Sequence, residues 1–458
     1  MLVRSKTGKY EFIDFRETAP AAAFQHMYNK NVNLSIIGGL ASGIPGELRG
    51  LEYLHKNYGK LSWKSVVQPA VHVARYGFPV GKDLVRYIGL GIGTGSNFLK
   101  DNPSWALDFA PNGTLVGLGD TLTRKRYADT LETISIHGAE AFYTGAIANT
   151  TITALQASNG TMTLEDLKHY KVKIRDPVSI KYKDYTLHAC SAPSGGVVAL
   201  AALNIFNGYE TSNPSTINLT THHLVESMKW AYGQRTQLGD PSFAPNLTTF
   251  QANMLSQKTA REIRAQISDA TTFTTSHYDP LGIQSLNDSG TSHVVTADKD
   301  GLAITLTTTI NLLFGSRLII PETGIIMNNE MNDFSIPGYV RPHCTPQTPY
   351  ISHVLTVPTL QRNKRIRLHP QYSKLHPPRQ APPVIHLPHH RRDPRWQTLP
   401  SRRFRRRLPN NNRYHPKHPP HARRRPQSRA STRETPLTRP INACDYIFRE
   451  VRIECRGV

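Results

Sequence analysis

The residues DSGTSH at 288–293 could carry nucleophilic chemistry, because they place a threonine where a small, turn-prone stretch meets a strand. The hydroxyl of Thr291 is a poor nucleophile by itself and needs a base to accept its proton. The α-amino group of the same residue can be that base once the bond from Gly290 is cut, since its ordinary pKa of about 7.7 to 8 lies near operating pH. Taken alone, the same residues are more typical of a loop before a strand than of a nucleophile.

Other catalytic fingerprints fit the sequence poorly. The run GLGIGTG at 89–95 follows a helix-like segment and lacks an acidic partner about 20 residues later, so it predicts a flexible turn and no dinucleotide site. The sequence has no G-x-S-x-G elbow and no H-E-x-x-H zinc motif. His222 and His223 are neighbours that cannot share one helix face, and they are expected at the surface. We expect no metal site.

The elements before Thr291 are predicted to be mainly helical. Hydrophobic spacing indicates helices over 44–58 and 63–76, the second with a kink or break at Pro69. Thr163, followed by Asp166, predicts a capping box at the start of a short helix. The alternating segment IRDPVSIKYKDYTLHAC then predicts strands, and further helices are expected in VVALAALNIFNGY, in THHLVESMKWAYGQR and from about Ala252 to Ser268.

The pattern changes to strands from Ser292 onward. The segment SHVVTADKDGLAITLTTTINLLFG alternates and is rich in β-branched residues, with Lys299-Asp300-Gly301 as turn chemistry between two strands. Another strand is predicted over Gly324–Met327. Helices first and strands later predict an α+β domain in which helices cover a sheet.

Residues 339–458 differ in composition from the rest of the chain. They hold 26 of the 55 Lys and Arg but 5 of the 33 Asp and Glu, together with 19 of the 33 Pro and a single Gly, Gly457. High like-sign charge, dense proline and few apolar residues predict a disordered, basic tail rich in Arg, Pro and His. Such a tail could neutralise nucleic-acid phosphates or an anionic lipid surface, so a binding protein is an alternative to an enzyme.

Glycosylation triplets point to the secretory pathway. The N-glycosylation candidates are Asn33, Asn112, Asn149, Asn159, Asn218, Asn246 and Asn287. The start, MLVRSKTGKYEF, has no apolar targeting segment, and no run of about 18 apolar residues follows. The chain is therefore expected to be cytosolic or to lack its start. Its four cysteines have neither a disulfide framework nor metal-ligand spacing.

Long collinear segments resemble the gamma-glutamyltransferases, also called glutathione hydrolases, of the fungal type. GTSHVVTADKDG, LTTTINLLFGS and GIIMNNEMNDFS are similar to the start of the family's small subunit. IDFRETAPAAA, GGLASGIPGELRGLEYLHKNYGKL, MTLEDLKHY, APSGG and MKWAYGQRTQLGDP are similar to its large subunit, in the same order. The likeness runs from about residue 1 to Gly338. It implies the N-terminal nucleophile hydrolase fold, a four-layer αββα sandwich.

The resemblance also implies a reaction. A large-subunit-like region, 1–290, and the start of a small-subunit-like region, 291–338, would arise by self-cleavage between Gly290 and Thr291, and the two chains would stay associated. Thr291 would then attack the γ-carbonyl of glutathione or another γ-glutamyl compound. Water would hydrolyse the resulting ester, or an amino acid or dipeptide would accept the glutamyl group. No cofactor is implied, and the family's location is extracellular, membrane-anchored or vacuolar.

Binding roles carry over from the resemblance position by position. Arg16 matches the arginine that binds the substrate α-carboxylate, where a planar fork can bond both oxygens. Glu330 and Asp333 match the acidic residues that hold the α-amino group, and Asn311 matches a neutral hydrogen-bonding partner. Thr309 matches the second threonine, which orients the nucleophile.

Two departures from the family pattern accompany these matches. The family has a longer start, so the chain is expected to be truncated there. After Gly338 the family continues with a Ser pair that binds the substrate carboxylate and a Gly pair that forms the oxyanion hole, whereas residues 339–458 contain neither Ser-Ser nor Gly-Gly. A reading-frame shift or an unspliced intron would produce such a tail. A catalytically inactive member of the family is a further alternative.

Overall fold

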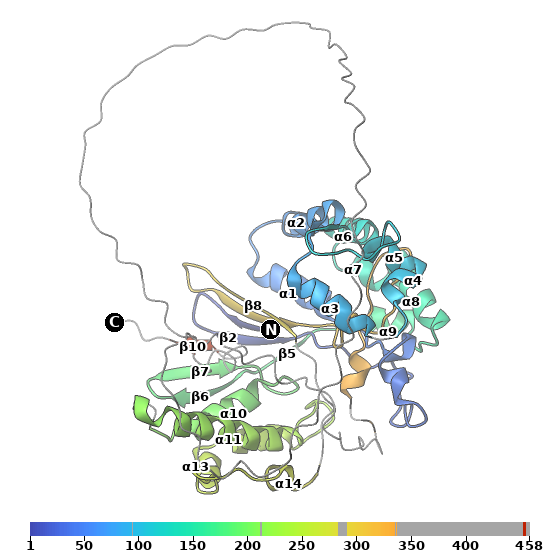
Figure 1. Cartoon of the computed structure of the whole chain (residues 1–458). Coiled ribbons are helices and arrows are strands. Elements are labelled where there is room, and N and C mark those ends of the chain that lie inside the picture. The colour runs from blue at the N-terminus through green and yellow to red at the C-terminus, as the bar shows by residue number, and fades with distance from the viewer. Residues whose placement is uncertain (94, 211–212, 283–290, 335, 337–451, 455–458) are drawn as a thin grey trace, which may run out of the picture. The chain divides into compact units, whose positions relative to one another are not determined.

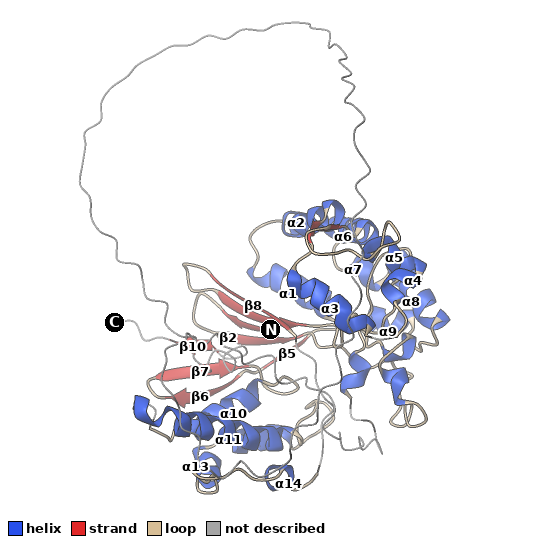
Figure 2. Cartoon of the chain, viewed as in Figure 1, coloured by secondary structure: helices blue, strands red, loops and turns tan. Residues whose placement is uncertain are grey.

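The structure is a computed structural model that describes residues 1–93, 95–210, 213–282, 291–334, 336 and 452–454. These residues belong to one compact unit. Two β-sheets pack between layers of helices (Figures 1 and 2), joined by apolar side chains. The predicted α+β sandwich is confirmed. The predicted tail, 339–458, lies outside the described residues except for Arg452–Glu454, which form a strand and not a disordered segment.

The first sheet has five antiparallel strands in the order β5-β2-β1-β9-β8. Their bounds are β1 Leu2–Arg4, β2 Tyr10–Asp14, β5 Lys173–Arg175, β8 Ser292–Ala297 and β9 Ala303–Thr308. The β8–β9 hairpin turns at the predicted Lys299-Asp300-Gly301. Gly301 has a φ of +85°, which a residue without Cβ adopts readily, and Asp298 Oδ1 accepts the main-chain N–H groups of Asp300 and Leu302.

Strand alternation gives the first sheet two apolar faces. Met1, Val3 and Ile13 lie on one face, where Tyr53 and Leu54 of α1 (Glu47–Tyr58) pack on them. The intervening residues Leu2 and Phe12 lie on the opposite face and contact Cys190, beside the second sheet. Because successive side chains of a strand point to opposite faces, this register places α1 on one side and the second sheet on the other.

The second sheet has the order β10-β7-β6, with β6 Val178–Tyr182, β7 Tyr185–Ala189 and β10 Arg452–Glu454. Ile180 and Leu187 pack against Leu200 and Leu203 of α10 (Gly196–Phe206). Next to α10 lie α11 Ile217–Arg235, α12 Leu247–Met254 and α13 Gln257–Arg264, and next to α11 lie α14 Thr275–Tyr278 and the 3-10 helix η3 Pro214–Thr216. These helices complete the outer layer on this side.

The remaining helices pack around two further apolar clusters, one centred on Tyr143 and Leu155 and one on Trp105. The α-helices are α2 Trp63–Tyr76, α3 Lys82–Ile92, α4 Phe98–Asp101, α5 Pro103–Phe109, α6 Lys125–His137, α7 Glu140–Tyr143, α8 Gly145–Ala157 and α9 Leu164–His169. The 3-10 helices are η1 Val32–Ser35, η2 Gly39–Ala41 and η4 Glu330–Asp333, and two short strands, β3 Phe78–Pro79 and β4 Thr121–Leu122, pair with each other. None of the helices in the described part of the chain is long and apolar enough to cross a membrane.

Several local predictions were wrong. Residues 89–95 were expected to form a turn, but the first four of them belong to α3. Glycine at position 91 serves close packing, because a Cβ there would lie 2.6 Å from the Phe314 ring. Of the kink or break expected at Pro69, the break is absent, since α2 runs through this residue, and the single helix expected over 252–268 is two, α12 and α13. His223 is buried against Tyr209 and bonds Asp269 at 2.7 Å, so it is no surface residue.

The strand predicted over Gly324–Met327 is also not formed. The segment makes a single bridge, Ile319 with Ile326, and its apolar residues enter two different clusters instead of lining one face of a sheet. Its main chain bonds to the residues just before it, with Ile320 N–H donating to the Ile325 carbonyl and Met327 N–H to the Leu318 carbonyl. Local bridging therefore replaces the predicted strand.

Candidate active site

The two threonines lie at the open end of the β8–β9 hairpin. The last cross-strand pair is Ser292 with Thr308, so Thr291 and Thr309 come next on the two strands, and both are exposed. Thr309 Oγ1 accepts the main-chain N–H of Asn311 at 2.8 Å. A hydroxyl that accepts this bond can still donate its own proton to a neighbouring oxygen. The other member of the predicted cleavage pair, Gly290, lies outside the described residues.

Thr308 points to the other face of the hairpin and joins it to α1. Its hydroxyl donates to Glu47 Oε2 at 2.9 Å, and Glu47 is in the first turn of α1. Burial raises the pKa of the Glu47 carboxyl, and the bond from Thr308 opposes that rise. The strand end that carries Thr309 is thereby fixed to a helix on the opposite side of the sheet.

Asn311 lies in a tight bend immediately after this strand end. It has a φ of +69°, a left-handed conformation that Asn tolerates better than most residues, and it is buried. Its Nδ2 donates to the carbonyl of Asn329 at 3.1 Å, while Asn329 Oδ1 accepts the Leu312 N–H at 3.0 Å. Asn329 Nδ2 also donates to the Ile36 carbonyl at 3.1 Å. Asn329 therefore fixes the bend relative to two other segments.

Asn328 connects the acidic segment to the glycine-rich segment around residue 43. Its Nδ2 donates to the Gly43 carbonyl at 3.0 Å, and its Oδ1 accepts the Gly43 N–H at 2.9 Å and the Glu330 N–H at 3.0 Å. A Cβ on Gly43 would lie 3.0 Å from Glu17 Cγ, so this close approach favours glycine. These bonds position η4, which carries Glu330 and Asp333.

Arg16 lies among carboxylates from two segments of the chain, its own and η4. Its Nη2 is 3.1 Å from Asp333 Oδ2, and its Nε is 3.4 Å from Glu17 Oε1. Burial by itself lowers the pKa of the guanidinium, but Glu17, Asp333 and Glu330 outweigh burial and raise that pKa above its usual value. Arg16 therefore stays charged while its side chain remains about half exposed, at 45%.

Glu17 is a site residue that the sequence prediction missed. Its side chain is 12% exposed, and burial raises the pKa of its carboxyl although Arg16 opposes the rise. The available signal was its place directly after Arg16 in FRETAP. With Glu330, whose exposure is 3%, and Asp333, it makes an acidic wall around one arginine. Such a site can hold a group that carries both a carboxylate and an ammonium.

The structure thus brings together Arg16, Glu330 and Asp333, with Asn311 joined to them through the Asn328-Asn329-Glu330 segment. Thr309 reaches this group through its bond to Asn311. Within the described ranges, no hydrogen bond joins Thr291 to these side chains, and no three His, Cys, Asp or Glu side chains cluster as a metal site. The assembled side chains can bind a group that carries a carboxylate and an ammonium, and Thr291, the candidate nucleophile, lies at the adjoining strand end.

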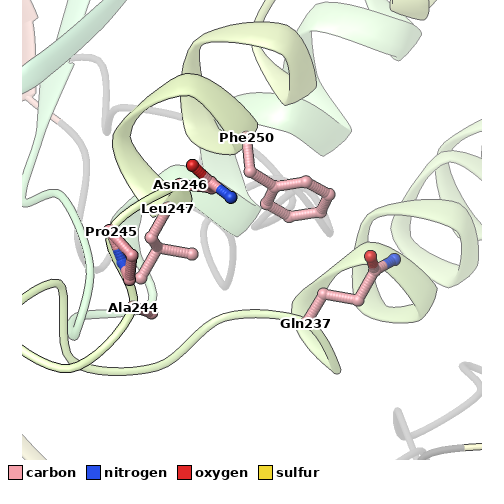
Figure 3. Close-up of a pocket in the computed structure, with 6 residues that line it drawn as sticks. All are labelled: Gln237, Ala244, Pro245, Asn246, Leu247 and Phe250. Atoms are coloured by element: carbon pink, nitrogen blue, oxygen red, sulfur yellow. The ribbon is translucent and has the colours of Figure 1, made fainter.

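A cavity of about 300 Å³ lies elsewhere, at the start of α12 (Figure 3). It is lined by Gln237, Ala244, Pro245, Asn246, Leu247 and Phe250. None of these is a candidate catalytic or substrate-binding residue, so the cavity does not locate the chemistry.

Comparison with known proteins agrees with the geometry. Residues 1–351 match the family model described as Gamma-glutamyltranspeptidase. The chain belongs to this family. The predicted fungal resemblance is also confirmed, because the glutathione hydrolase proenzyme of Arthroderma benhamiae is 57% identical over 341 residues, which cover 74% of this chain and 58% of the relative. The glutathione hydrolase of Aspergillus flavus is 49% identical over 339 residues, which cover 74% of this chain and 56% of that relative.

Solved structures of family members and acylases share the fold. A cephalosporin acylase from Bacillus halodurans superimposes with a TM-score of 0.62 at 27% identity, covering 74% of this chain and 61% of the acylase. The gamma-glutamyltranspeptidase of Helicobacter pylori gives 0.56 at 28% identity, covering 60% of this chain and 80% of that protein. The chain spans less than three fifths of the length of the Arthroderma benhamiae and Aspergillus flavus relatives.

Proposed function

We propose that this chain carries the active site of a glutathione hydrolase that matures by cutting itself between Gly290 and Thr291. The observation that carries the proposal is the acidic wall around Arg16, connected through Asn311 and Thr309 to the strand end where Thr291 lies. The family match and the two fungal glutathione hydrolases support the same reaction. Its substrates are glutathione and other γ-glutamyl compounds.

The chemistry follows from one hydroxyl and one amine. The free α-amino group of Thr291 takes the hydroxyl proton as Oγ attacks the γ-carbonyl, and a tetrahedral intermediate forms. Its collapse breaks the amide bond, the leaving amine takes the proton, and a γ-glutamyl ester remains on Thr291. Water, or the amine of an amino acid or dipeptide, then attacks the ester and releases glutamate or a new γ-glutamyl compound. Thr309 orients the attacking hydroxyl.

Different residues bind the two charged groups of the glutamyl head group. Arg16 binds the α-carboxylate through two parallel hydrogen bonds, and to do so its Nη2 exchanges Asp333 for the ligand. Asp333 and Glu330 then bind the α-ammonium, and Asn311 offers its amide oxygen to the same group.

Maturation would use the same hydroxyl as catalysis. We assign residues 1–290 to a large chain, 291–338 to the start of a small chain, and 339–458 to a tail of separate origin, by frameshift or intron. The large and small chains remain associated, because β8 and β9 are hydrogen-bonded into the same sheet as β1, β2 and β5.

We predict slow turnover from the chain as it stands. Residues after Gly338 contain no Gly-Gly pair to donate to an oxyanion, and loss of one such donor costs about 10² to 10³ in rate. Hydrolysis of γ-glutamyl-p-nitroanilide should therefore be at least about 10²-fold slower than by the Arthroderma benhamiae relative. Thr291→Ala supplies the background rate.

A chimera tests whether slow turnover is caused by the tail or by the active site. When the residues after Gly338 are replaced by the corresponding segment of the Arthroderma benhamiae relative, activity should rise toward that relative's level. Full activity in the unmodified chain, abolished by Thr291→Ala, would contradict the predicted role of the tail. An inactive, correctly folded chimera would contradict the proposed function.

Glycosylation in the secretory pathway is a second part of the proposal. All the candidate asparagines within the described ranges are exposed, namely Asn33, Asn112, Asn149, Asn159, Asn218 and Asn246, while Asn287 lies outside them. Asn246, visible in Figure 3, begins α12 without a side-chain capping bond. An oligosaccharide is large and hydrophilic, so it needs such surface positions.

Secretion from yeast behind a signal peptide tests this. We expect peptide N-glycosidase to increase the gel mobility of the chain, and Asn→Gln changes at the occupied triplets to reproduce the shift one step at a time. Asn207→Gln, outside any triplet, is the matched control and should change nothing. Unchanged mobility after the enzyme treatment would contradict glycosylation.

A further inference from the structure

Two motifs of the sequence end close to Arg16 although the proposed chemistry gives them no role. MTLEDLKHY ends at Tyr170, and MKWAYGQRTQLGDP contains Asp240 near its end. In the structure the Tyr170 hydroxyl donates to the Arg16 carbonyl at 2.7 Å, and Asp240 accepts a bond from Arg175 at 3.0 Å. The first motif therefore contacts the segment that presents the guanidinium directly, and the second reaches it through Arg175, which also bonds Asp14.

Arg16 lies in an irregular segment after β2, so no strand or helix ladder fixes its main chain. Its N–H instead donates to Asp14 Oδ1 at 3.0 Å, and its carbonyl accepts the Tyr170 hydroxyl. Burial raises the pKa of that hydroxyl, which keeps it protonated and able to donate. Further along, Ala21 N–H donates to Asp166 Oδ1 at 2.9 Å. Side chains thus fix both ends of the segment.

The carboxylate of Asp14 also binds Arg175 of β5. It is 8% exposed, and its Oδ2 accepts Arg175 Nε at 2.6 Å. Arg175 also donates to Asp240 Oδ1 at 3.0 Å, and the same oxygen accepts the Ser242 N–H at 2.9 Å. A buried carboxylate is stable only when its charge is paired and its oxygens are bonded, and both conditions are met here.

We propose that Asp14, Tyr170, Arg175 and Asp240 are positioning residues that aim Arg16 at the α-carboxylate of the bound glutamyl group. The inference rests on the proposed function, because it takes that carboxylate as the ligand of Arg16. A bidentate contact tolerates little misplacement of the fork, so supporting side chains control its strength. Loosening them should weaken recognition of the carboxylate more than recognition of the rest of the ligand.

The test compares two ligands that the enzyme does not consume. L-Glutamate carries the α-carboxylate, and L-isoglutamine has a carboxamide in its place. Calorimetric titration of the full chain gives the dissociation constant of each and hence the preference for the carboxylate. We expect Asp14→Asn and Tyr170→Phe each to reduce this preference roughly 3- to 10-fold, the scale of one lost supporting hydrogen bond. Arg16→Ala should abolish the preference.

Matched controls make the same chemical changes elsewhere. Asp129→Asn breaks an ion pair with Arg75, 2.7 Å long, between α2 and α6, and Tyr278→Phe removes a buried hydroxyl that donates to Glu226 of α11. Both controls should keep the wild-type preference. Thermal unfolding of every variant shows whether it is folded, and Asp14→Glu, which keeps the charge, should retain more preference than Asp14→Ala.

The outcomes separate the two proposals. If the wild-type chain binds neither ligand, the proposed function fails and this inference fails with it. If glutamate binds and Arg16→Ala abolishes the preference, but Asp14→Asn and Tyr170→Phe leave it unchanged, the positioning role alone is overturned. Equal weakening of both ligands in these variants would show a general structural effect and would also overturn it.

Discussion

Thr291→Ala is expected to give a single uncut chain with no γ-glutamyl turnover above background. In the proposed mechanism the hydroxyl is the attacking group both in the cut after Gly290 and in the formation of the γ-glutamyl ester, and alanine can do neither. Removal of the nucleophile in an enzyme that forms a covalent intermediate lowers the rate by about 10⁴ or more. Because the uncut chain also lacks the free amine, the base is lost together with the nucleophile.

Gel electrophoresis and Edman sequencing measure the cut. The wild-type chain should give two fragments, the smaller one beginning Thr-Ser-His. Ser292→Ala is the matched control, since it removes the next hydroxyl along β8 and should leave cleavage intact. Thr291→Ser should cleave as well, because it keeps a hydroxyl. Two fragments from Thr291→Ala, or a wild-type cut at another residue, would contradict the assignment.

Arg16→Ala should weaken binding of the glutamyl head group by about 10² to 10³, the range for truncating one partner of a hydrogen-bonded charge pair. Two effects act together. The ligand carboxylate loses its bidentate partner, and it then faces Glu17, Glu330 and Asp333 without an intervening cation. Repulsion is therefore added to the lost attraction.

Titration with L-glutamate measures this effect without requiring turnover. Arg16→Lys should fall between wild type and alanine, because an ammonium keeps the charge but lacks the planar fork. Arg86→Ala, at an exposed arginine on α3, is the control for loss of one positive charge. An affinity for glutamate that Arg16→Ala leaves unchanged would remove Arg16 from the site.

Local sequence signals predicted much of the fold because each rests on neighbouring residues. The capping box of Thr163 and Asp166 is formed in both directions, and Ser62 caps α2 through the Ser65 N–H. Gly77, at the end of α2, has a φ of +88°. The hairpin turn at Gly301 follows from the same kind of short-range chemistry.

Tertiary packing decided the cases that local signals got wrong. Gly91 looks like a turn residue, but its missing Cβ makes room for the Phe314 ring, more than 200 residues away in the chain. The segment Gly324–Met327 has strand composition, yet its residues are divided between two apolar clusters. A hydrophobic pattern predicts which side of a helix or strand is buried. It does not predict which distant residues pack against that side.

The candidate site shows the same limit. Family resemblance selected Arg16, Asn311, Glu330 and Asp333, and the structure places Arg16 against Asp333. The resemblance could not indicate that Asn328 and Asn329 hold these groups by bonds to Gly43 and Ile36, nearly 300 residues earlier. An asparagine in such a position looks like any polar loop residue until its partners are known.

The position of β1 between β2 and β9 has a consequence for how the matured protein would come apart. After a cut at Gly290, the hydrogen bonds between Leu2–Arg4 and Ala303–Thr305 would join two separate polypeptides, supported by Arg4 donating to the Gly301 carbonyl at 2.8 Å. Unfolding would then release two molecules, and reassembly would require them to meet, so recovery would depend on concentration. At low concentration the separated chains would not reassemble, so unfolding would be irreversible. The durability of the mature molecule would then be a lifetime, set by the rate at which the shared sheet opens.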